Sequence, residues 1–380
     1  KNVLGAWQRR MDKDVTRHVI MPYGFGDGGG GPTEEMLESA RYMAKGLPGI
    51  PQMRLGRADA FFAQLSADAA QCRKLPRFAD ELYLEFHRGT YTSVAKIKRD
   101  NRRAEQRILA AELLAALAPD PDFDREAVWK KIMLNQFHDV LPGSAIEAVY
   151  RQCDEDYRAV FSACDRAIEK GLRAVTGRGD EALCVVNPTW THQPRILLLE
   201  GMKGRAPMRN GRLLPSQELS DGRVAVYVED LPTVGVETFA LAPMDAPVTG
   251  SMIATSDLLE NRFFRLEFNA AGQIIRLFDK RAGREVLKPD TVGNAILAYE
   301  DRPASCDAWN IDVNYVEKEY PVDGPAKVEA VENGAVCAAV CVTREFMHSR
   351  MTQTIRLYRD LPRIDFETEV DWHERQIALK

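Results

Sequence analysis

A single carboxylate lies within a run of glycines near the start of the chain. Residues 24–33 read Gly-Phe-Gly-Asp-Gly-Gly-Gly-Gly-Pro-Thr, and Asp27 is their only acidic residue. Glycine allows the backbone to approach a ligand closely. Because the loop follows the strand-like run Val19-Ile20-Met21, Asp27 is a candidate acid or base. The alternatives are a solvated aspartate in a flexible loop and a phosphate cradle, although the cradle would lack its lysine and Asp27 would repel the phosphate.

A histidine and an aspartate are adjacent further along the chain. His138 and Asp139 lie in residues 135–144, Asn-Gln-Phe-His-Asp-Val-Leu-Pro-Gly-Ser, at the expected end of a helix. A lone histidine is more often a structural residue than a metal ligand, and the sequence has no His-Glu-x-x-His or Cys-x-x-Cys pattern. These residues alone therefore do not specify a complete metal site, although polar neighbours could orient the imidazole or contact a substrate.

Two further segments combine aromatic and charged side chains. Residues 84–93 read Leu-Glu-Phe-His-Arg-Gly-Thr-Tyr-Thr-Ser, and residues 301–312 read Asp-Arg-Pro-Ala-Ser-Cys-Asp-Ala-Trp-Asn-Ile-Asp. Sugar sites use this combination, since an aromatic ring stacks on the apolar face of a sugar while carboxylates bind its hydroxyl groups. Asp307 and Trp309 are candidates for such contacts. Packing between domains is the alternative for both segments.

The composition is typical of a water-soluble globular protein. Of the 380 residues, 45% are hydrophobic and 28% are charged, and no apolar run is long enough to span a membrane. The formal net charge is −5, from 51 basic and 56 acidic residues spread along the chain, so we expect no binding to nucleic acid or to membranes. Seven cysteines without a Cys-x-x-Cys pair favour buried, reduced thiols and a cytoplasmic location.

The first half of the chain contains two patterns, which is expected because 380 residues are too many for one ordinary core. The initial pattern alternates strand-like runs with helices and indicates part of an α/β domain. The second pattern, in residues 86–178, indicates a bundle of three helices. The strand-like runs are residues 19–21 and 50–55; the helices are one capped by Thr33, one over 58–65, one over 101–118, one starting near Asp124 and one over 146–172.

After residue 178 the sequence is typical of β-structure. Short alternating stretches separated by turn residues predict a large antiparallel sandwich. Residues 269–272 are expected to form a hairpin turn, and no closing strand is expected in residues 371–380. The predicted strands cover residues 183–186, 195–199, 223–228, 237–241, 263–268, 273–278, 335–343, 352–358 and 363–370.

Taken in order, the polar segments resemble the α-mannosidases of glycoside hydrolase family 38, especially the cytosolic and bacterial branch. The resemblance covers essentially the whole chain. It rests on residues 24–33, 83–93 and 134–144, on Val-Val-Asn-Pro at 185–188, on Leu-Glu-Asn-Arg-Phe-Phe-Arg-Leu-Glu-Phe at 259–268, and on Glu-Asp-Arg-Pro at 300–303 followed by Asp-Ala-Trp at 307–309.

This resemblance implies a retaining hydrolase of terminal α-mannosides in oligosaccharides, with a zinc ion that binds the mannose hydroxyl groups. The implied fold is the tail of an α/β catalytic barrel in residues 1–85, a three-helix middle domain in 86–178 and a truncated antiparallel β-sandwich domain in 179–380. By motif match, Asp27 is the acid/base, His138 is a zinc ligand, Asp139 contacts a substrate hydroxyl, and Asp307 and Trp309 belong to the wall of the site.

The sequence departs from the family pattern in three places. The family has a His-x-Asp pair of metal ligands and a nucleophilic aspartate early in its catalytic domain, and neither has a counterpart here; His18-Val-Ile lacks the pair. Asn310 stands where related sequences often have aspartate. We therefore expect this chain to be a fragment of the enzyme, inactive by itself and a poor zinc binder.

Two other classes of function are compatible with parts of the sequence or excluded by it. A non-catalytic carbohydrate-binding or scaffold protein built from the same domains is the main alternative. A metalloprotease or phosphatase would need a cluster of ligands that the sequence does not contain. Family members often assemble, so a homo-oligomer is left open by the sequence.

Overall fold

A computed structural model describes residues 2–26, 29–75, 77–80, 85–176, 182–244 and 252–380. Asp27 lies outside these described residues. The chain divides into two compact units, Lys1–Tyr83 and Leu84–Lys380, and each is considered by itself.

The described residues of the first unit form three helices joined by irregular chain. They are α1 (Asn2–Arg9), α2 (Glu34–Ala44) and α3 (Ala58–Ala70). The predicted cap of α2 is confirmed, because the Thr33 hydroxyl accepts a hydrogen bond from the Met36 N–H. The predicted strands at 19–21 and 50–55 are wrong: both segments are irregular. A strand needs a backbone partner, and the described residues of this unit pair neither segment in a ladder.

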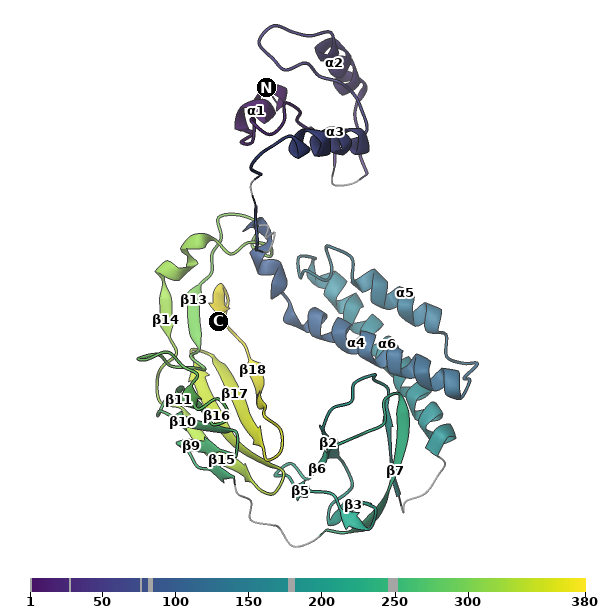
Figure 1. Ribbon diagram of the computed structural model, residues 1–380, viewed down its shortest axis with the longest axis vertical. Helices are drawn as coiled ribbons and strands as arrows, with labels where there is room; N and C mark the ends of the chain where they lie inside the picture. Colours follow the sequence, from purple (N-terminus) through teal and green to yellow (C-terminus); the bar gives the residue numbers. More distant parts are fainter. Residues whose placement is uncertain (1, 27–28, 76, 81–84, 177–181, 245–251) are drawn as a thin grey trace. The chain divides into compact units, whose positions relative to one another are not determined.

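The second unit begins with a helical bundle. After the short 3-10 helix η1 (Glu85–Tyr91) come α4 (Ala95–Leu117), α5 (Arg125–Asn135) and α6 (Glu147–Thr176), which pack side by side (Figure 1). Asp124 caps α5 by accepting from the Ala127 N–H. The predicted three-helix bundle is confirmed. Its core is formed by residues spaced at helical intervals, including Ala104, Ile108, Ile132, Tyr157, Val160 and Cys164.

The described residues after α6 form β-structure arranged in five antiparallel sheets. Their strand orders are β1-β7-β3-β4, β2-β6-β5, β12-β11-β10-β9-β8, β14-β13-β19 and β15-β16-β17-β18. The strands are β1 (Ala182–Asn187), β2 (Arg195–Leu199), β3 (Arg205–Arg209), β4 (Arg212–Leu213), β5 (Ser216–Glu218), β6 (Val224–Val228), β7 (Gly235–Pro243), β8 (Ile253–Ala254), β9 (Leu258–Glu260), β10 (Phe264–Phe268), β11 (Ile274–Asp279), β12 (Arg284–Glu285), β13 (Leu297–Glu300), β14 (Glu319–Pro321), β15 (Lys327–Asn333), β16 (Cys337–Phe346), β17 (Ser349–Tyr358), β18 (Ile364–Asp371) and β19 (Ile377–Leu379), with a 3-10 helix η2 (Val313–Glu317).

The largest β-core lies between the sheet containing β10 and the sheet containing β16 and β17. Leu259, Leu266 and Phe268 from the former pack with Val340 and Ile355 from the latter. The predicted hairpin between β10 and β11 is confirmed, and its Gly272 has φ +68°. A Cβ there would lie 2.4 Å from Val342 Cγ1, so both the turn and the packing require glycine.

The predicted antiparallel β-domain is confirmed, and its strands form several sheets that bury their apolar side chains in separate cores. One expectation about the β-region needs correction. Residues 371–380 do contain a strand: β19 pairs with β13, where Tyr299 is opposite Ala378. Pairing satisfies backbone groups of β13 that would otherwise lack partners. Among the described residues, no helix has the length and apolar character needed to cross a membrane.

Candidate functional site

His138 and Asp139 lie in a turn beyond the end of α5, since the last residue of that helix is Asn135. Both side chains are exposed, His138 at 78% and Asp139 at 56%, and His138 Nε2 is 3.6 Å from Asp139 Oδ2. The imidazole also lies against the Phe137 ring, with 4.3 Å between ring centroids. The pair is therefore accessible to a metal ion or a sugar hydroxyl.

The backbone of this turn is held by the bundle beneath it. The Tyr150 hydroxyl donates to the Val140 carbonyl at 3.2 Å and accepts from the Ala145 N–H at 2.9 Å. Burial raises the pKa of Tyr150, so its hydroxyl stays protonated as the donor requires. Lys98 Nζ, from the first turns of α4, donates to the Leu141 carbonyl at 2.9 Å. The turn is thus attached at both of its sides to long helices.

The segment around η1 connects the bundle to the loop that carries Asp307 and Trp309. The Gly89 N–H donates to the Trp309 carbonyl at 2.7 Å. The Ser93 hydroxyl lies 2.8 Å from the Gly89 carbonyl and 2.9 Å from the Ala308 carbonyl. A Cβ at Gly89 would lie 3.1 Å from the Trp309 oxygen, which is tight. The described residues of the polar segments at 85–93 and 301–312 therefore meet.

Within the second loop, the two candidate residues differ in exposure. Asp307 is exposed and Trp309 is half-buried. The neighbouring Asn310 is buried; its amide donates to the Ser305 carbonyl, but its Oδ1 has no hydrogen-bond partner. Asp301 lies at the start of the loop, and burial, followed by the charges of Asp307 and of Asp312, raises the pKa of its carboxyl. The Asp301 carboxyl is therefore partly desolvated and lies near two other carboxylates.

The structure brings three of the four polar segments into one region of the second unit. Sequence reasoning assigned no role to Lys98 or Gly143, and the structure shows that both hold the His138 turn. Nothing in the sequence distinguishes Lys98 from the other basic residues of α4, so its role could not be predicted. The sequence offered only a weak indication of the role of Gly143, which is a glycine directly after a proline, a pair typical of turns. In the structure Gly143 has φ +90°.

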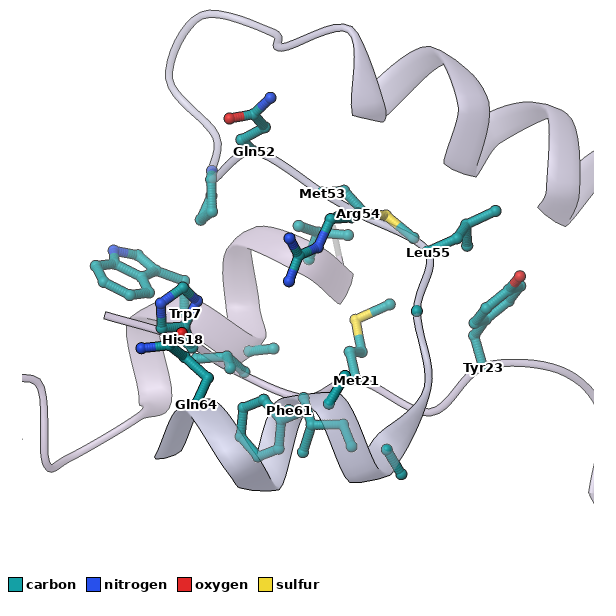
Figure 2. Close-up of a pocket in the computed structure, with 18 of the residues that line it drawn as sticks. Trp7, His18, Met21, Tyr23, Gln52, Met53, Arg54, Leu55, Phe61 and Gln64 are labelled. Atoms are coloured by element: carbon teal, nitrogen blue, oxygen red, sulfur yellow. The ribbon is translucent and has the colours of Figure 1, made fainter. Parts of the chain in front are cut away.

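A cavity in the first unit has a volume of about 350 Å³. Figure 2 shows Trp7 and His18 near one end and Tyr23 near the other, with Arg54 and Phe61 between them. Its lining contains aromatic, aliphatic and cationic side chains and, among the described residues, no carboxylate. None of the described candidate residues His138, Asp139, Asp307 and Trp309 lines this cavity.

The fit of zinc to these residues is limited. His138 Nε2 is exposed and suits one ligand position, with Asp139 beside it. A structural zinc site takes four protein ligands and a catalytic site takes three. Within the described ranges, no group of three or more His, Cys, Asp or Glu is placed to hold a metal ion. The described residues therefore supply only part of a zinc site.

Comparison with known families first defines the class of protein. Three consecutive models match: the glycosyl hydrolases family 38 N-terminal domain at residues 1–81, the alpha mannosidase middle domain at 85–175 and the glycosyl hydrolases family 38 C-terminal domain at 259–380. The chain belongs to glycoside hydrolase family 38, whose models match it in this order along the sequence.

Individual relatives agree with this assignment. Over its whole length the chain is 29% identical to human Alpha-mannosidase 2C1 and 26% identical to Alpha-mannosidase G of Dictyostelium discoideum. It spans only 36% and 39% of the length of those proteins. The crystal structure of an alpha-mannosidase from Enterococcus faecalis V583 shares the fold, with a TM-score of 0.63, 12% identity, and coverage of 91% of this chain and 49% of that one.

Proposed function

We propose that this chain is part of a retaining, zinc-dependent α-mannosidase that hydrolyses terminal α-mannosides of glycans. The observation that carries the proposal is the arrangement in the second unit, where the exposed pair His138–Asp139 and the loop with Asp307 and Trp309 are both attached to the start of α4. The names of the relatives, all alpha-mannosidases, supply the substrate class.

The proposed roles follow from the chemistry of each side chain. Asp27 donates a proton to the leaving glycosidic oxygen and later accepts one from water. Asp139 accepts hydrogen bonds from sugar hydroxyl groups, Trp309 offers a ring face to the sugar, and Asp307 adds a carboxylate at the same wall. His138 holds zinc, which when bound would fix hydroxyl groups of the mannose.

The proposal also covers what this chain does by itself. Its 380 residues contain no His-x-Asp motif, and we propose that zinc binding is weak and turnover absent in the isolated chain. Reduced thiols fit a cytoplasmic location, and all seven cysteines are free.

The test compares the isolated chain with the longer enzyme that contains it. We expect the longer enzyme to release nitrophenol from a nitrophenyl α-mannoside and the 380-residue chain to release none. In the longer enzyme, Asp27→Asn should lower kcat by about 10²- to 10⁴-fold, the contribution of general acid catalysis. Asp80→Asn serves as a control carboxylate in the same unit.

Three possible failures have different meanings. Turnover by the isolated chain would show that no further residues are needed for catalysis. Full activity of the Asp27→Asn enzyme would remove Asp27 from the acid/base role. Absence of turnover in the unaltered longer protein would favour the carbohydrate-binding or scaffold alternative.

A further inference from the structure

Ser93 lies where the two candidate loops meet the bundle. Its carbonyl oxygen accepts from Lys98 Nζ at 2.5 Å, and its hydroxyl lies 2.8 Å from the Gly89 carbonyl and 2.9 Å from the Ala308 carbonyl. A hydroxyl has one hydrogen, so it is shared between the two carbonyls or alternates between them. Ser93 thereby connects the start of the bundle to the loop of Asp307 and Trp309.

Lys98 makes the connection to the other loop. Its ammonium group donates to the carbonyls of Ser93 and Leu141, the second at 2.9 Å, and the side chain is half-buried. Burial lowers the pKa of Lys98. The lysine one half-turn earlier behaves differently: Lys96 is exposed and forms ion pairs with Asp100 and Asp154. Among the described residues, no carboxylate forms an ion pair with Lys98, so its donors serve the backbone.

Gly143 allows the turn of His138 to approach the Ser93 carbonyl closely. It has φ +90°, and a Cβ built on it would lie 2.2 Å from the Ser93 carbonyl oxygen. Any side chain at position 143 would therefore collide with the same carbonyl that Lys98 binds. The contact between the turn of His138 and the start of α4 depends on a bare backbone at this point.

We propose that Lys98 and Ser93 are positioning residues that set where the His138–Asp139 turn and the Asp307–Trp309 loop lie relative to each other. Lys98 fixes the first through Leu141, and Ser93 fixes the second through Ala308. The proposal rests on the proposed function, in which both loops contact one sugar. Neither residue touches the substrate.

The first experiment measures amide hydrogen exchange in the 380-residue chain. Lys98→Met should speed exchange in residues 137–144 by about 10-fold or more, because it removes a hydrogen bond from a charged donor. The amides of Val140, Leu141 and Gly143 are bonded within this turn and report on it. Lys96→Met, the matched control on the same helix, should leave this segment within about two-fold of the parent chain, because Lys96 pairs with Asp100 and Asp154 and not with the carbonyls of this turn.

Ser93→Ala should affect the other loop. Faster exchange is expected in residues 306–310, where the amides of Trp309 and Asn310 both donate to the Cys306 carbonyl. Ser162→Ala, which removes a surface hydroxyl from α6, is the control. In both variants the amides of β16 and β17 should exchange as in the parent chain, because they lie in a separate core.

The second experiment separates positioning from general destabilisation in the longer enzyme. Lys98→Met should raise KM for an α-mannoside more than it lowers kcat, and Lys98→Arg, which keeps the donors, should restore most of the loss. If the parent enzyme hydrolyses no α-mannoside, the proposed function fails, but the exchange experiment still decides the positioning role.

Three results would overturn the inference. One is exchange in residues 137–144 that is the same in Lys98→Met and Lys96→Met. Another is acceleration throughout the bundle, which would make Lys98 a stability residue only. If Lys98→Met does not fold, Lys98→Gln takes its place, and unchanged exchange in that variant counts equally against the proposal.

Discussion

The helices of the first unit and those of the bundle begin in similar ways but bury very different amounts of side chain. In α3 no residue is buried, and α2 buries only Ala40. In contrast, α4 and α6 each bury seven residues. Large apolar side chains of the first unit remain exposed, among them Phe62 at 55% and Phe25 at 63%.

This difference in burial indicates which of the two units is stabilised by tertiary packing. Caps and helical spacing define helices in both units, but most of the stability of a helix in a protein comes from packing its apolar face. The bundle achieves this packing within the chain, and α2 and α3 do so only slightly. The turn of His138 and Asp139 is therefore attached to a well-packed support.

The largest contrast is expected from truncating one apolar side chain in each unit. Ile108→Ala removes a fully buried side chain of α4 and should lower the free energy of unfolding by about 2–5 kcal/mol. Phe62→Ala in α3 should cost less than about 1 kcal/mol, because the ring is more than half exposed. Hydrogen exchange measured at increasing urea concentrations gives the free energy of unfolding of each unit and so measures both losses. Equal losses would contradict the comparison; Leu109→Ala, exposed on α4, is the control.

A smaller contrast is expected from adding a methyl group to a helical glycine. A Cβ on Gly171 of α6 would lie 2.6 Å from Leu114 Cβ, so Gly171→Ala should destabilise the bundle by about 1–3 kcal/mol. The nearest atoms to a Cβ on Gly5 of α1 are 3.7 Å away, at the end of the Arg9 side chain. Gly5→Ala should be neutral or stabilise by up to about 1 kcal/mol. Thermal melting of both variants tests this, and a neutral Gly171→Ala would show that the bundle is loosely packed there.

The smallest contrast is expected at the helix caps. Thr33→Ala and Asp124→Ala each remove one side-chain acceptor from a helix N-terminus and should each cost about 1 kcal/mol of local stability. Because capping is a local interaction, the two losses should be alike even though burial differs between the units. Exchange of the amides of Met36 and Ala127 measures them. A much larger loss at Asp124 would mean that caps too depend on the surrounding core.

Much of the fold could be predicted from the sequence, because helical and alternating spacings are local properties. The stripe of α6 and the hairpin at Gly272 are examples, and both are confirmed. The strands predicted at 19–21 and 50–55 were wrong because an apolar run forms a strand only with a hydrogen-bonded neighbour, which local sequence does not reveal. Strand β19 was missed for the converse reason: its partner, β13, lies some 80 residues earlier in the chain.

The candidate site likewise has features that could be predicted from the sequence and features that could not. The types and order of residues such as His138, Asp139 and Trp309 were enough to predict the family and the chemistry proposed for them. Only the tertiary structure decided how two of those segments are held, through Lys98 and Ser93. The physical reason is that these contacts run from side chains to backbone carbonyls 43 and 215 residues away. Every residue, proline included, carries a backbone carbonyl, so the residue type does not show in advance which carbonyl will be the partner.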